Sequence, residues 1–139
     1  MSLLIKASGK AALPFIIDGG GAAIETGEKG HLSVPFGCLI DRVTMLADME
    51  GSIRVDIWKS RLDGFPPTAE ESITGGNPPR IDLGNSYEDS GLEHWGKALS
   101  EGDILAFNVD SVGGGGVMGL RDGGGSITRV TISLHVRKT

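Results

Sequence analysis

The 139-residue sequence predicts an all-β fold, an antiparallel β-sandwich of jelly-roll type. Along most of the chain apolar and polar residues alternate, and a period of two is that of a strand with one buried face. The 23 glycines are clustered between the apolar runs, where they favour turns and loops. Several half-buried strands need a second sheet to cover their apolar faces, which favours sheet-on-sheet packing.

The strand pattern is clearest in three segments near the middle and the end of the chain, and weaker in three before them. Residues 49–51 separate two of these segments and predict a turn. The predicted strands are residues 13–17, 31–36, 39–47, 52–59, 103–110 and 126–137.

A long Pro/Gly-rich stretch, residues 62–90, interrupts the strand pattern. Its proline pairs exclude a central strand, so we predict a crossover from one sheet to the other. Thr68 and Glu71 have the spacing of a capping box, which predicts one helical turn near residues 69–73. A second glycine-rich loop is predicted at residues 113–125.

Two units are expected: a sandwich domain over residues 13–139 and an N-terminal attachment arm over residues 1–12. Leu3, Leu4 and Ile5 are adjacent apolar residues that a strand with one wet face cannot bury together. Such an arm is suited to docking on a neighbouring subunit, with a disordered tail as the alternative. The start of the chain lacks the apolar length of a signal peptide.

Charge and titratable residues exclude several classes of function. The net charge of −5, without a basic stripe, argues against nucleic acid or an anionic membrane as partner. Cys38 lies in an apolar run, which predicts a buried, unreactive thiol. His31, His94 and His135 have no second ligand at metal spacing, so we expect no metal and no other cofactor. No catalytic motif is evident, and the weakest alternative is a polysaccharide depolymerase with paired acids.

Trp58 is the candidate contact residue. It shares the polar face of its predicted strand with Arg54 and Asp56, so either a loop covers it or a partner or glycan binds it. Trp95 is expected in the core. Tyr87 is a further candidate aromatic for glycan contact.

Seven stretches, in this order, resemble a module of tailed-bacteriophage virion proteins that is often found in tail or fibre proteins. The stretches are Phe15–Gly21, Val34–Cys38, Gly51–Lys59, Phe65–Thr68, Ser72–Gly75, Gly102–Ser111 and Thr128–Leu134. The resemblance covers residues 13–139. Two departures from the module are expected. Residues 112–125 are a long glycine-rich insertion, and the module makes up nearly the whole chain, whereas it is usually appended to a longer protein.

The resemblance implies a non-enzymatic structural protein on the surface of a virion, as a head decoration, head fibre or tail component. Its partners would be other virion proteins. We also expect a homo-oligomer, with a trimer favoured, because Trp58 and Leu46 lie on otherwise polar faces. The alternative function is a module that binds a host-surface glycan.

Overall fold

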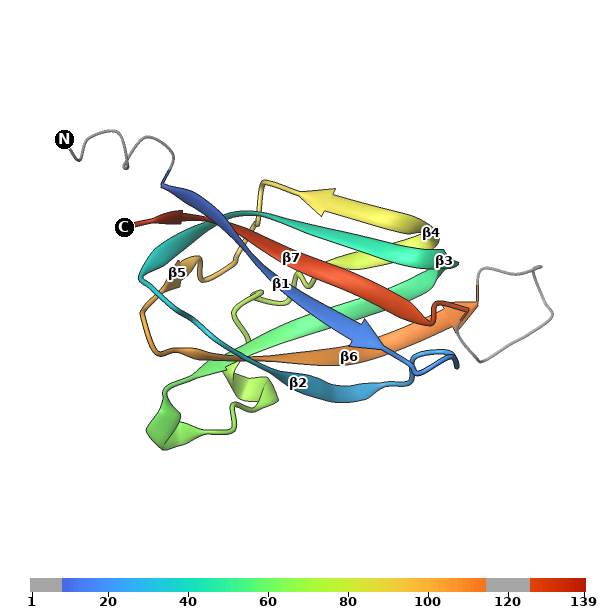
Figure 1. The fold of residues 1–139 in the computed structure, drawn as a ribbon, viewed down its shortest axis with the longest axis horizontal. Coiled ribbons are helices and arrows are strands. Elements are labelled where there is room, and N and C mark those ends of the chain that lie inside the picture. Colours follow the sequence, from blue (N-terminus) through green and yellow to red (C-terminus); the bar gives the residue numbers. More distant parts are fainter. Residues whose placement is uncertain (1–8, 115–125) are drawn as a thin grey trace.

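The computed structural model describes residues 9–114 and 126–139, which form one curled antiparallel sheet (Figure 1). The all-β prediction is confirmed. Within these residues, no helix is long and apolar enough to cross a membrane. The strands are β1 (Lys10–Asp18), β2 (Gly27–Ser33), β3 (Cys38–Ser60), β4 (Arg80–Asp89), β5 (Ala98–Leu99), β6 (Ile104–Gly114) and β7 (Arg129–Lys138), with 3-10 turns η2 (Leu62–Gly64) and η3 (Ala69–Glu71).

The long strand β3 organises the sheet, whose order is β1-β7-β3-β6-β2. The first part of β3, residues 38–47, pairs with β7, and its last part, residues 51–60, pairs with β6. In Figure 1, β3 crosses the molecule, bends at the right-hand end and returns. We call β1, β7 and the first part of β3 the first half of the sheet, and β2, β6 and the last part of β3 the second half.

The prediction that residues 49–51 form a turn between two strands is wrong. The chain bends there, but it stays in one 23-residue strand. The register against β4 shifts between Leu46 and Gly51, so the bend is a large bulge. A bulge adds residues to one strand and bends it while the pairing on both sides continues.

The predicted crossover is also shorter than expected, because β4 occupies its second part. Only Ile81 is buried among the residues of β4, so the strand has no clear alternating pattern. It forms along the second edge of β3, whose backbone groups need hydrogen-bond partners. The capping box of Thr68 and Glu71 is confirmed, at η3.

At the N-terminus, β1 begins at Lys10, three residues before the predicted strand. Residues 10–12 therefore pair with β7 instead of belonging to the arm. Leu3, Leu4 and Ile5 lie outside the described residues, as do residues 115–125 of the second glycine-rich loop.

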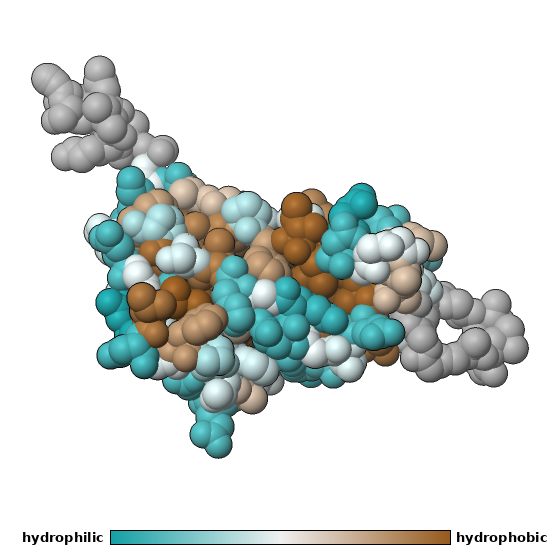
Figure 2. Space-filling model, turned by 60° about the horizontal axis from the view of Figure 1, so that its bottom comes forward, coloured by the Kyte–Doolittle hydropathy of each residue, from teal (hydrophilic) through white to brown (hydrophobic). Residues whose placement is uncertain are grey.

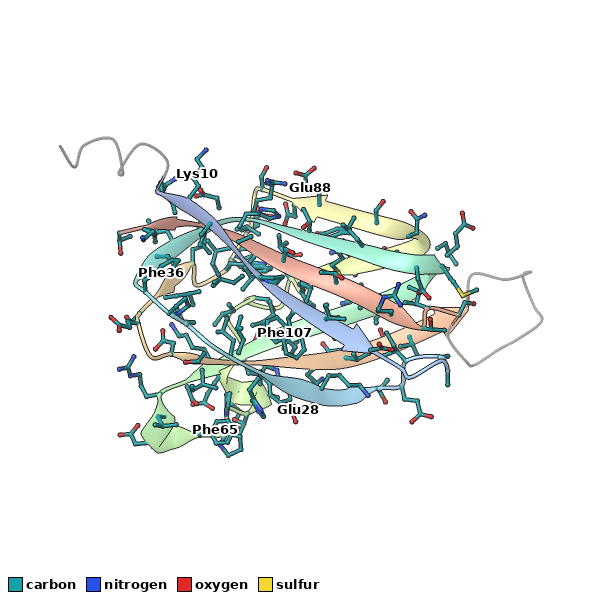
Figure 3. The ribbon with its side chains drawn as sticks, viewed as in Figure 1. Lys10, Glu28, Phe36, Phe65, Glu88 and Phe107 are labelled. Carbon is teal, nitrogen blue, oxygen red and sulfur yellow. The ribbon has the colours of Figure 1, made fainter. Side chains whose placement is uncertain are left out.

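The two ends of the sheet meet across the core. The ring of Phe15 in β1 stacks on Phe107 in β6, with centroids 4.3 Å apart and planes at 7°, and Phe107 lies at the centre of the molecule (Figure 3). Gly30 in β2 has a φ of +147°, and a Cβ built there would lie 2.8 Å from the Phe15 ring. The absence of a side chain at Gly30 therefore allows β1 and β2 to approach.

We predict that Gly30→Ala destabilises the protein by about 3 kcal/mol or more, because it adds both a clash with Phe15 and backbone strain. Gly27 is the matched control, since it lies on the same strand at φ +123° with no atom within 4 Å of a built Cβ. Gly27→Ala should cost about 1–2 kcal/mol, from strain alone. Urea unfolding measures both, and equal losses would contradict the packing role of Gly30.

Candidate functional site

Asp56 lies on the outer face of the second half of the sheet and holds the loop that follows β3. Its Oδ1 accepts hydrogen bonds from Ser72 Oγ and Thr74 Oγ1, both at 2.7 Å, and from the backbone N–H of Ile57 at 2.8 Å. Its Oδ2 accepts from Trp58 Nε1 at 3.0 Å. Thr74 is 1% exposed. The carboxylate thus has four donors and works as a structural anchor for residues 72–74.

The Trp58 side chain is half-buried beside this anchor. Ser72 pairs with it in an isolated bridge, and Ala106 lies opposite it on β6. Ala106 is fully buried although it faces away from the core, because it lies between Trp58 and His31 of the neighbouring strands. The structure therefore places Trp58 and Asp56 in direct contact, against the loop.

His31 extends the same face toward the edge of the sheet. Its Nε2 lies 3.1 Å from a carboxylate oxygen of Glu28, and its ring meets the Phe65 ring edge-on with centroids 4.7 Å apart. Phe65 and Glu28 lie near one another at the lower edge of the view (Figure 3). Phe65 is 47% exposed, which makes it the accessible aromatic ring of this face. Sequence reasoning missed its pairing with His31, because the two residues are 34 positions apart.

Arg54, the third predicted contact residue, is exposed and lies opposite Arg80 of β4 and Ser111 of β6. Close by, Asn108 Nδ2 donates to Asp110 Oδ1 at 2.7 Å. Burial raises the pKa of Asp110, the Asn108 hydrogen bond and the Arg54 charge oppose this rise, and the Asp56 charge adds to it. The three predicted residues therefore share one face, but only Trp58 and Asp56 are bonded to each other.

A second carboxylate, Asp103, anchors the end of the molecule away from the bend of β3. It is 3% exposed and lies 2.9 Å from Arg61 Nη1 and 3.9 Å from Lys59 Nζ. Its Oδ2 also accepts from the backbone N–H of Ser100 at 2.8 Å. A buried charge with this set of donors ties the start of the post-β3 loop to the turn before β6.

A groove of about 520 Å³ lies at this same end of the molecule, beside Lys59 near the end of β3. One side is the loop segment after η3, and the other is the approach to β5. Lys59 donates to the carbonyl oxygen of Ala98 at 3.2 Å across it. The lining residues are Lys59, Glu71, Ser72, Ile73, Gly75, His94, Gly96, Lys97 and Ala98.

The outer face of the first half has a different character. Ile16 and Leu46 are 59% and 61% exposed, and both lie opposite Thr131 of β7, on its two sides. The adjoining row is Pro14, Ser133 and Thr44. We call these six residues the flat face, which is uncharged although the chain carries a net charge of −5. Brown apolar areas separated by teal polar side chains are also visible on the face that Figure 2 shows.

The other candidates from the sequence have structural roles. Trp95 is 7% exposed and donates from Nε1 to the carbonyl oxygen of Asn77 at 3.0 Å, so its prediction as a core residue is confirmed. Tyr87 is half-buried in β4, where the Arg80 guanidinium lies 5.9 Å from its ring centre. Cys38 is buried as predicted, and burial, with the Asp103 charge, raises its pKa.

In residues 9–114 and 126–139 no three His, Cys, Asp or Glu side chains group to hold a metal.

Neither a protein-family model nor a curated protein is similar to this chain.

We predict that Asp56→Ala destabilises the protein by about 2–4 kcal/mol, because it leaves the buried Thr74 hydroxyl and the Trp58 N–H without their acceptor. Asp63→Ala is the control, since Asp63 is an exposed carboxylate of η2 in the same loop. It should change stability by no more than about 0.5 kcal/mol. Chemical unfolding followed by tryptophan fluorescence measures both variants, and an equal small effect would contradict the anchor.

We also predict that His135 makes the protein less stable at mildly acidic pH. Burial and then the Arg42 charge lower the pKa of His135 below 6.5, with Glu88 opposing them, and its Nε2 lies 3.0 Å from Thr44 Oγ1. A folded-state pKa below the unfolded one gives stability that is present above pH 6.5 and is lost as pH falls toward the folded value. Urea titrations across this window should show a smaller loss for His135→Gln, and parallel curves would refute the effect.

Proposed function

We propose that this chain is a non-enzymatic structural protein on the surface of a tailed-phage or phage-like virion, as a head decoration, head fibre or tail component. Two features support the proposal: the ordered resemblance over residues 13–139, and a strand-rich fold with an exposed apolar flat face. The flat face is the observation that carries the docking role, because exposed Ile16 and Leu46 on an uncharged surface favour contact with another protein.

In finer detail, we propose that the curled sheet is a jelly-roll sandwich. The first and second halves of the sheet would be its two layers, joined by the bend in β3. Pairing of β7 and β6 with separate parts of β3, and the Phe15–Phe107 stack between the halves, support this interpretation. Residues 1–8, with Leu3, Leu4 and Ile5, would serve as an attachment arm.

The alternative is a module that binds a host-surface glycan through the second half of the sheet. Exposed Phe65, beside His31 and Glu28, is the observation that favours it, since aromatic rings next to carboxylates are suited to sugar contact. A glycan array probed with the whole chain tests this function. Binding that Phe65→Ala abolishes would favour the glycan module.

The docking role predicts that the chain co-purifies with the phage or phage-like particles whose genome encodes it. The double variant Ile16→Ser with Leu46→Ser should lower its occupancy on those particles roughly tenfold, because it removes two apolar contacts. Leu62→Ser is the matched control, since Leu62 is 73% exposed in η2, away from the flat face, and should leave occupancy unchanged. Antibody detection on gradient-purified particles measures it.

Deleting residues 2–8 tests the arm in the same assay. Loss of occupancy with an unchanged melting temperature would support the arm. If instead the unmodified chain stays wholly in the soluble fraction and is absent from particles, the virion proposal is contradicted.

A further inference from the structure

Two exposed apolar side chains, Met49 and Leu83, lie at the bends of β3 and β4. They are 49% and 69% exposed. In Figure 1 both bends lie at the right-hand end of the molecule, and the cross-strand pair of Gly51 and Gly84 holds them side by side. We call Met49 and Leu83 the apolar corner.

Leu83 is unfavourable at its position in two respects. Its φ is +51°, in the left-handed region that disfavours residues with a branched or bulky side chain, and its side chain faces solvent. Glycine or asparagine satisfies both the backbone and the solvent better. Backbone strain of this kind is concentrated at sites of function, and a partner that buries the leucine supplies a reason for it.

The groove of about 520 Å³ lies near the end of β3, at the end of the molecule opposite to the apolar corner, which lies at the bend of that strand. Its lining includes Ile73, Gly75, Gly96 and Ala98, which are apolar or lack a polar side chain and add little side-chain bulk. Lys59, on its wall, is eight residues beyond Gly51 along β3, which is about 26 Å of extended strand. The corner of one molecule therefore cannot fill its own groove.

Among the described residues, each end also carries a charged residue without an ion-pair partner, Glu50 at the corner and Lys97 at the groove, and the two charges are of opposite sign. Glu50 and Asp82 adjoin the corner in sequence, and the Asp82 side chain is 77% exposed with one 3.7 Å contact to Arg80. Lys97 lines the groove. Within the described part of the chain, neither Glu50 nor Lys97 forms an ion pair. Unpaired charges of opposite sign at the two ends of the folded molecule favour contact between copies.

We propose that the apolar corner of one copy inserts into the groove of a second copy, so that the chain self-associates head to tail. Glu50 then approaches Lys97 of the next molecule. An interface between two different surfaces closes into a ring or extends as a filament, depending on the rotation between neighbours. This inference goes beyond the virion proposal and holds or fails without it.

Sedimentation equilibrium over a range of protein concentrations tests the proposal. Leu83→Asn should weaken self-association about tenfold or more while raising the melting temperature, because it relieves the left-handed leucine. Leu62→Ser, an equally exposed leucine outside the corner, is the control and should leave association unchanged. A wild-type chain that stays monomeric at every concentration would overturn the proposal.

Charge reversal tests the pairing itself. Glu50→Lys and Lys97→Glu should each weaken association, and the double variant should restore it, because the attraction is exchanged between the two ends. Failure of this rescue, with both single variants folded, would refute contact between these residues.

Mixing two variants tests the head-to-tail geometry. The Leu83→Asp variant keeps the groove but loses the apolar corner. The Ala98→Arg variant keeps the apolar corner, but its groove is filled by the arginine. Each should be monomeric alone, and an equal mixture should form a 1:1 pair and nothing larger. Association lost in the Ile16→Ser, Leu46→Ser chain but kept in Leu83→Asn would instead assign self-contact to the flat face and overturn the proposal.

Discussion

The bend in β3 is the constraint on which the sheet depends. Four strands, β4, β5, β6 and β7, pair with β3 directly, and β1 and β2 pair with β7 and β6. If β3 ran straight, the two halves would form one open sheet with an uncovered apolar face. Because the strand folds back at its bulge, residues from both of its parts, such as Met45 and Ile57, belong to one buried core. Asp48 fixes the bend to the start of β7, because its carboxylate accepts hydrogen bonds from the hydroxyl and N–H of Thr128 and from the N–H of Arg129. These bonds lower the pKa of Asp48, and the bond from the Thr128 hydroxyl contributes most.

Carboxylates attach the loops that the core does not hold. The segment after β3 contributes few buried apolar side chains, with Ile73 the main one, so its position depends on polar contacts. Asp56 and Asp103 each accept several hydrogen bonds or ion pairs from this segment or its neighbours. Such groups are stabilising when fully satisfied and costly when a partner is removed, so they specify one loop conformation. The face with Trp58 and Phe65 therefore depends on the anchors beneath it.

The surfaces of the molecule differ in what they can contact. The flat face has neutral hydroxyls between apolar side chains, whereas the loop-covered face carries aromatic rings beside carboxylates. The free edge of β1 is a poor template for an added strand. Bonds from Lys138 N–H to the Gly9 carbonyl and from Gly19 N–H to the Thr128 carbonyl show that odd-numbered residues of β1 bond to β7. The backbone of the even-numbered Pro14 therefore points to the free edge, where proline has no N–H to donate to an added strand.

The sequence by itself determined the strand class, most strand positions and, in the three clearest segments, which side is buried. Alternation such as Val130, Ile132 and Leu134 has a period that only a half-buried strand satisfies. The capping box and the buried Cys38 were also evident, because both depend on local sequence. Tertiary structure alone decided that residues 49–51 bend within a strand and that the polar segment Arg80–Asp89 joins the sheet. It also brought His31 to Phe65 and made Asp56 an anchor. These features depend on partners distant in sequence, and a backbone edge or a hydroxyl donor leaves no hydrophobic pattern by which to find it.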